Sequence, residues 1–158
     1  MKNQFILSLS LLLCSAFFTQ AQTASVEEEI DAIKKVVQSA YVEGLQNEGN
    51  AAKIDAGFHP GFELIGISKG DQIWKLPIYT WKEGALNDVK TGKKPKTGDD
   101  IVTVKFKLVD VTGTAAVVKL VFFVGEKKTY IDYLSLYKFE SGWKIVNKIF
   151  YKIPEDKE

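Results

Sequence analysis

Few side chains of this sequence could carry acid–base chemistry, and Asp132 is the first candidate. It lies in the mostly apolar segment Tyr130 to Tyr137, where burial would raise the pKa of a carboxyl group, as a general base requires. The alternation of this segment places Asp132 on the face opposite Trp143, unless a bulge shifts the register. A hydrogen bond at a sheet edge or a dimer face is therefore the competing interpretation.

His59 is the second candidate for a catalytic base. It is the only histidine and the only side chain expected to titrate near neutral pH. It precedes Pro60 in a predicted turn at the rim of the fold, where capping the turn is the alternative role. One histidine cannot assemble a histidine-rich zinc site, and no other metal-ligand spacing occurs, so no metal site is predicted.

A further group of residues could hold a ligand without reacting with it. Trp74, Tyr79 and Trp81 surround one predicted helix start and could stack on a planar molecule, or simply cover the open end of the fold. Ser135 and Asn147 are expected to face each other inside a cavity, where they satisfy each other or a ligand. The candidate pocket walls are Tyr41, Trp74, Trp81, Tyr133, Ser135 and Asn147.

Composition excludes several kinds of chemistry. All 21 basic residues are lysines and the net charge is +1, so neither nucleic acid nor an anionic membrane is an expected partner. The one cysteine, Cys14, lies in the N-terminal apolar run, which leaves no thiol for catalysis once that run is removed. No glycine-rich phosphate loop or serine–histidine–aspartate signature occurs, and no cofactor is expected.

The N-terminus has the pattern of a secretory signal peptide. Lys2 precedes an apolar run from Phe5 to Phe18, and Thr19-Gln20-Ala21 places small residues where a signal peptidase cleaves. We therefore expect a signal peptide at 1–21 and one domain at 22–158, exported to the periplasm or the medium, with no membrane contact after cleavage. A retained N-terminal anchor, or a lipoprotein through Cys14, remains the alternative.

The spacing of apolar residues predicts helices first and strands last. Ser25 and Glu28 form a capping box before a helix of about 20 residues. A short helix follows Asn50, then a strand over 62–67 with a partner over 72–74, and a third helix begins near Pro77. From Ile101 the period changes to two, which predicts a four-stranded antiparallel meander.

The last hairpin carries most of the candidate residues. With a three-residue turn around Ser141-Gly142, Phe139 would face Trp143, and Ser135 would face Asn147. The opposite face would then carry Lys144, Lys148 and Lys152 with Val146 and Phe150. We interpret this face as a solvated strand surface, or as one covered by a second copy of the chain.

Several motifs resemble the nuclear transport factor 2-like superfamily. They are Gly57-Phe58-His59-Pro60, Trp74-x-x-Pro77, Val109 to Ala115, Tyr130 to Tyr137 and Gly142 to Val146. Within it, the sequence is similar to the small exported bacterial group named "putative lumazine-binding". The resemblance implies an α+β fold, a nuclear transport factor 2-like cone with N-terminal helices packed on a curved antiparallel sheet. It also implies a homodimer through the sheet, a common arrangement in the superfamily.

The superfamily hosts enzymes and binding proteins alike. Our leading hypothesis is a protein that binds a small apolar or planar molecule in the cone. One alternative is a cofactor-free isomerase or dehydratase with Asp132 or His59 as base, although these residues do not match a known catalytic dyad one for one. The other is an interaction module that works through its sheet face.

Overall fold

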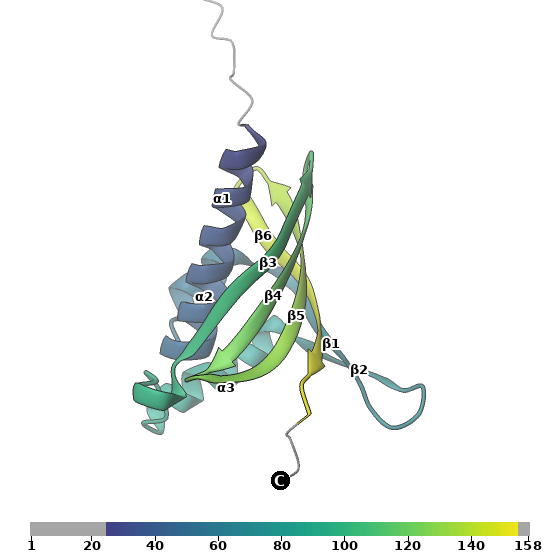
Figure 1. Ribbon diagram of the computed structural model, residues 1–158. Coiled ribbons are helices and arrows are strands. Elements are labelled where there is room, and N and C mark those ends of the chain that lie inside the picture. Colours follow the sequence, from purple (N-terminus) through teal and green to yellow (C-terminus); the bar gives the residue numbers. More distant parts are fainter. Residues whose placement is uncertain (1–24, 155–158) are drawn as a thin grey trace, which may run out of the picture.

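The computed structural model describes residues 25–154. The predicted signal peptide lies outside the described residues. Within 25–154, the long first helix and two shorter α-helices come before most of the sheet and gather on one side of it, while the strands curve around them (Figure 1). A single 3-10 turn, η2 (Gly98–Asp100), precedes the meander. No helix in this part of the chain is both long and apolar enough to cross a membrane.

The first helix is continuous but changes geometry at its middle. α1 (Val26–Val36) begins at the predicted capping box, in which Ser25 and Glu28 exchange hydrogen bonds of 2.7 and 3.2 Å. It passes directly into η1 (Val37–Glu48), a π-helix that ends at Gly49 in the left-handed conformation. π-Helical turns are rare and often lie at functional sites; this one carries Tyr41.

Two shorter helices complete the helical layer. α2 (Ala51–Gly57) begins at Asn50, whose side chain accepts a hydrogen bond from the Lys53 amide. α3 (Ile78–Lys90) begins directly after Pro77. Both start where the sequence predicts.

The sheet has six strands in the order β2-β1-β6-β5-β4-β3. β3 to β6 form the predicted antiparallel meander, and β1 adds to it parallel to β6. β1 already begins at Phe58, so His59 and Pro60 belong to its first residues rather than to the predicted turn. The bounds are β1 (Phe58–Ile67), β2 (Ile73–Pro77), β3 (Val102–Thr112), β4 (Ala115–Val124), β5 (Lys127–Phe139) and β6 (Gly142–Lys152).

The last hairpin differs from the predicted register in one decisive way. Its loop has two residues, so Phe139 pairs with Gly142 and Lys138 with Trp143, while Ser135 still pairs with Asn147. Between these two stretches of pairing, β6 has one residue more than β5. This residue is Val146, which has no partner on β5 and forms a bulge. A bulge reverses which side chains of a strand face the core, because side chains alternate with a period of two.

The core lies between the long helix and the concave face of the sheet. Trp143 is buried there, and its indole N–H donates a 2.6 Å hydrogen bond to Glu29 of α1. Beyond the bulge, Lys148 is buried on the same side. The fully buried side chains with the largest volumes include Tyr41, Phe62, Ile33, Leu45, Ile54, Leu120, Leu134 and Leu136.

Candidate functional site

Three polar side chains from three elements meet inside the cone. The Tyr41 hydroxyl on η1 donates a 2.7 Å hydrogen bond to Asp132 Oδ2 on β5. Lys148 Nζ on β6 donates a 2.7 Å hydrogen bond to the Tyr41 hydroxyl oxygen and lies 3.0 Å from Asp132 Oδ1 as an ion pair. That contact is off the direction of a hydrogen bond, and Asp132 Oδ1 accepts none from the described residues.

The backbone explains why these groups meet. Asp132 pairs with Phe150 and Leu134 pairs with Lys148 across the β5–β6 ladder, so Asp132 and Lys148 are diagonal neighbours on one face. The bulge at Val146 brings Lys148 to that face. Tyr41 then reaches them from the helix opposite.

Tyr41 and Lys148 of this cluster line a cavity of about 190 Å³, and Asp132 lies buried behind them. Lys148 is the only amine among its lining residues, and most of the other lining side chains are aromatic. They are Tyr41, Gln46, Leu64, Trp81, Phe122, Tyr130, Lys148 and Phe150. The cavity is therefore an aromatic chamber with one amine in its wall.

Four of these aromatic rings surround the Lys148 amine. Nζ lies 4.9 Å from the ring centroid of Tyr41, 5.3 Å from that of Phe150, 5.6 Å from that of Trp81 and 6.0 Å from that of Phe122. Aromatic faces attract cations at these distances. They compensate part of the hydration that the ammonium loses on burial.

Burial moves the pKa values of the cluster toward the uncharged forms. It raises the pKa of Asp132 above its ordinary range, against the opposing charge of Lys148 and the Tyr41 hydrogen bond. It lowers the pKa of Lys148, against the attraction of Asp132. Burial, followed by the charge of Asp132, holds the pKa of Tyr41 well above its usual range. Tyr41 therefore stays a hydroxyl, while burial brings the pKa values of Lys148 and Asp132 closer together.

Asp132 and His59 occupy very different surroundings. Asp132 is completely buried and lies on the same face as Trp143, so the prediction that it points away from Trp143 is wrong. The reason is the two-residue loop, which shifts the pairing by one. His59 is half-buried, stacks on Phe139 at 4.8 Å and accepts a hydrogen bond from the Gly61 amide. It is not among the residues that line the cavity.

Two of the six predicted wall residues line the cavity, namely Tyr41 and Trp81. Trp74 is 37% exposed and does not line it, although its ring packs 6.0 Å from that of Phe150 and covers Gly66. Trp74 therefore contacts Phe150, a residue of the cavity wall, without lining the cavity itself.

The other three predicted wall residues lie elsewhere. Tyr133 is 43% exposed, and Ser135 lines a groove on the outer face of the sheet. Ser135 and Asn147 are paired as predicted, but the Asn147 amide donates a 2.9 Å hydrogen bond to the Glu63 carbonyl of β1. Placing these side chains inside the cavity was wrong, because Leu134 and Leu136 fill the inner positions of β5.

Lys148 is the residue that sequence reasoning missed, since the pattern places it on the outer face of the sheet, either solvated or covered by a second copy of the chain. A usable signal was present in β5, where Leu134 and Leu136 alternate with Tyr133 and Ser135. The leucines indicate that even-numbered positions are inside. That inward face includes Asp132, and the neighbouring strand β6 is one of the elements that could supply a basic partner.

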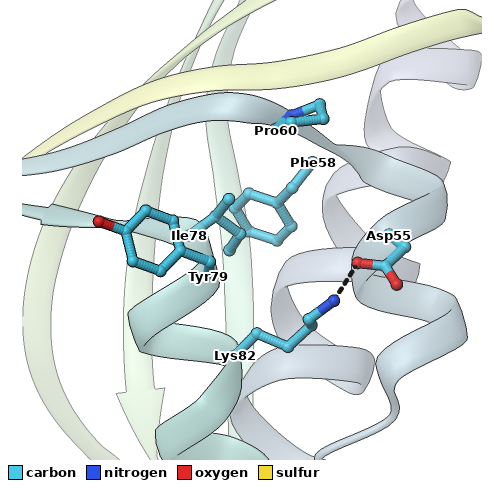
Figure 2. Close-up of a pocket in the computed structure, with 6 residues that line it drawn as sticks. All are labelled: Asp55, Phe58, Pro60, Ile78, Tyr79 and Lys82. Carbon is cyan, nitrogen blue, oxygen red and sulfur yellow. Dashed lines mark hydrogen bonds and ion pairs between the residues drawn. The ribbon is translucent and has the colours of Figure 1, made fainter.

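A second, larger pocket lies outside the cone, at the junction of α2, β1 and α3. It measures about 330 Å³, and Figure 2 shows the Asp55–Lys82 ion pair at its edge, 2.7 Å long, beside Phe58 and Ile78. The Asp55 side chain is 61% exposed and the Lys82 side chain 29%. Solvent screens such a pair, so this pocket lacks the desolvated polar groups of the cavity in the cone.

Solved structures share the fold. A nuclear transport factor 2-like protein of unknown function from Shewanella baltica OS155 superimposes with a TM-score of 0.63 at 23% identity, over 84% of this chain and all of that one. One from Silicibacter pomeroyi DSS-3 gives 0.66 at 17% identity, over 82% of this chain and all of that one. A domain with a cystatin-like fold from Nostoc punctiforme PCC 73102 superimposes with a TM-score of 0.58 at 13% identity, over 84% of this chain and 82% of that one. The α+β cone predicted from the sequence is thereby confirmed.

The family follows from the sequence match. The chain belongs to the family described as "putative lumazine-binding", whose model matches residues 28–151. This confirms the resemblance and describes a small-molecule-binding domain. A curated relative, aldolase FrzH from Cladobotryum sp, is 25% identical over 115 residues, which are 72% of this chain and 84% of that protein.

Proposed function

We propose that the protein binds one small planar molecule in the cone, with a polar acceptor of that molecule on Lys148. The observation that carries this proposal is the amine of Lys148 in the wall of an otherwise mostly aromatic cavity. An ammonium has three N–H donors; one bonds Tyr41, and the 3.0 Å ion pair with Asp132 engages at most one more. The third remains for a carbonyl oxygen, ring nitrogen or carboxylate of the ligand.

The size of the cavity limits the ligand. About 190 Å³ corresponds to roughly six water molecules, at about 30 Å³ each in the liquid. That is less than the usual range for drug-sized ligands. One aromatic ring, or a compact two-ring system such as a pteridine, is the class that fits.

Matched probes test this proposal. Acetophenone and ethylbenzene have nearly the same shape, but only acetophenone can accept a hydrogen bond from Lys148. We expect acetophenone to bind about tenfold more tightly by calorimetry, as one hydrogen bond to a charged group allows. Pteridine-2,4-dione, which is lumazine itself, tests the family's description in the same assay.

Leu64→Trp provides the control, because Leu64 lines the cavity and a larger side chain fills it. All probes should lose affinity in this variant. If no probe binds the wild type, or if Leu64→Trp binds as well as the wild type, the ligand does not occupy the cone.

Cofactor-free acid–base catalysis on a carbonyl compound is the second candidate function. The raised pKa of buried Asp132 suits a general base, and the resemblance to a protein named aldolase points to carbonyl substrates. Exchange of the α-protons of acetophenone with deuterated water, followed by NMR, tests it. Exchange should exceed the buffer rate and disappear in Asp132→Asn; equal rates in both would exclude this role.

A homodimer through the outer face of the sheet is a separate proposal. Apolar side chains on this face are exposed across neighbouring strands. They include Leu108, Val117, Tyr133, Tyr137, Ile149 and Tyr151. A second copy of the chain is the occupant that could cover them symmetrically. The third interpretation, an interaction module, would use this same face without needing the cavity.

Export also remains a proposal. The predicted cleavage after Ala21 leaves a mature chain that starts at Gln22, three residues before the capping box at Ser25. Intact mass of the protein from its native host checks this directly. A mass that retains residues 1–21 would contradict it.

A further inference from the structure

The Lys148 amine differs from an ordinary structural ion-pair partner. Its side chain is 7% exposed, yet it lines a cavity large enough for a ring compound. Asp132 lies 3.0 Å away and the Tyr41 hydroxyl 2.7 Å away. The amine and the phenol therefore line a cavity that a small molecule can enter, and the carboxyl group lies directly behind them.

A reactive amine must be able to lose its proton, and the cluster provides for this. Burial lowers the pKa of Lys148 and raises that of Asp132, so both effects favour transfer of the proton from Nζ to the carboxylate. The transfer replaces two buried charges by two neutral groups, which removes their desolvation cost. The aromatic rings around Nζ act in the opposite direction, because they favour the ammonium.

We propose that Lys148 forms a reversible imine with small planar aldehydes or ketones that enter the cone. This inference rests on the proposed function, because it names the ligand class of the same cavity. It adds a covalent bond to binding by hydrogen bonds alone. Desolvated lysines are the usual nucleophiles for this reaction.

The steps balance without a cofactor. Asp132 takes a proton from the Lys148 ammonium, and the free Nζ lone pair attacks the carbonyl carbon. A proton then moves from the nitrogen to the carbonyl oxygen, which gives a neutral carbinolamine. Asp132, relayed by Tyr41, returns the proton to the departing hydroxyl, which leaves as water. The product is a protonated imine on Nζ beside the Asp132 carboxylate, so the local charge is the same as at the start. Hydrolysis reverses every step.

Reductive trapping tests the imine. The full protein is incubated with benzaldehyde and sodium cyanoborohydride at pH 7, which converts any imine to a stable benzylamine, and peptide mapping locates the label. Lys82, at the surface and ion-paired with Asp55, is the internal reference. We expect Lys148 to be benzylated at least ten times faster than Lys82. Labelling of Lys148 at or below the Lys82 rate would overturn the proposal.

Two variants distinguish the role of Lys148 as the nucleophile from the role of Asp132 in proton transfer. Lys148→Arg keeps a cation beside Asp132 but forms no stable imine, so specific labelling should vanish while surface labelling stays. Asp132→Asn should slow labelling of Lys148 and move its pH profile, since the proton acceptor is gone. An Asp132→Asn rate and pH profile equal to wild type would exclude Asp132 as the relay. If Lys148→Arg fails to fold, the Leu64→Trp variant should still abolish labelling of Lys148 by filling the cavity.

Binding measured without the reductant distinguishes the two proposals. If acetophenone and benzaldehyde bind in the cone but Lys148 is not trapped, the imine is wrong and the binding function stands. If neither compound binds, the proposed function itself fails.

Discussion

The Tyr41 hydroxyl and the Asp132 carboxylate meet 2.7 Å apart, across the space between the helix and the sheet. Lys148 closes the cluster by donating to the same hydroxyl. All three side chains are almost fully buried, so each depends on the other two for its polar contacts.

Removing one charge of the pair should destabilise the protein more than removing both. Asp132→Leu or Lys148→Met alone leaves a buried group unpaired, and we expect a loss of about 3–5 kcal/mol in the free energy of unfolding. The double variant should recover most of this loss. Urea unfolding of the wild type, the two single variants and the double variant measures these free energies.

The exposed pair Asp55–Lys82 is the matched control. It has the same chemistry and a 2.7 Å contact, but lies at the surface. Asp55→Leu and Lys82→Met should each cost less than about 1 kcal/mol. Strictly additive losses at Asp132 and Lys148 would mean that the two groups are not energetically coupled.

The pH dependence of stability has a defined sign. Because the pKa of Asp132 is raised on folding, its contribution is fully present at acid pH and is lost as pH rises from about 4 through its folded pKa. Because the pKa of Lys148 is lowered, its contribution is lost as pH falls below about 10 through its folded pKa.

Relative to the double variant Asp132→Leu/Lys148→Met, the wild type should therefore be least stable near neutral pH and gain toward both extremes. Unfolding free energies between pH 4 and 10 measure this difference. A difference that peaks near neutrality would show a net stabilising ion pair instead.

Deleting Val146 should disrupt the site and the core together. Without the bulge, either Trp143 and Ile145 or Lys148 and Phe150 must leave the inner face of β6. We expect a loss of at least about 3 kcal/mol, comparable to the loss of a large buried side chain. Val146→Ala keeps the residue count and should cost about 1 kcal/mol or less. A deletion variant as stable as wild type would mean that the bulge does not set the register.

A charge on the outer sheet face should prevent the proposed dimer. Ile149 is 49% exposed beside Tyr133 on the neighbouring strand. Ile149→Lys should convert a dimer to a monomer in analytical ultracentrifugation without lowering stability. Val89→Lys, at an exposed position of α3, is the control and should leave the dimer intact. A wild-type protein that is monomeric at all concentrations would refute the proposed interface.

Much of the fold was predictable because local signals and tertiary structure agree. The capping box at Ser25 and the cap at Asn50 begin helices where expected. The change of period at Ile101 marks the meander correctly. These features depend on neighbours within four residues, which a single sequence displays.

The site was less predictable because it depends on the length of one hairpin loop, which sets the face of Asp132, and on one inserted residue, which sets the face of Lys148. Tyr41 was placed correctly by helical spacing, whereas Asp132 was put on the wrong face and Lys148 was overlooked. Nothing local marks Val146 as a bulge, and one extra residue exchanges the inner and outer faces of everything beyond it. Lysine is also rarely buried, so the residue type alone predicts an exposed Lys148. Its burial depends on Tyr41 and Asp132, which come from two other elements.

Native mass spectrometry of the mature protein, purified gently from its own host, tests the central claim most directly. We predict that the wild type retains one small molecule per chain, and that Leu64→Trp, purified in parallel, retains none. A wild-type protein that carries no ligand, or a ligand that persists in Leu64→Trp, would contradict binding in the cone.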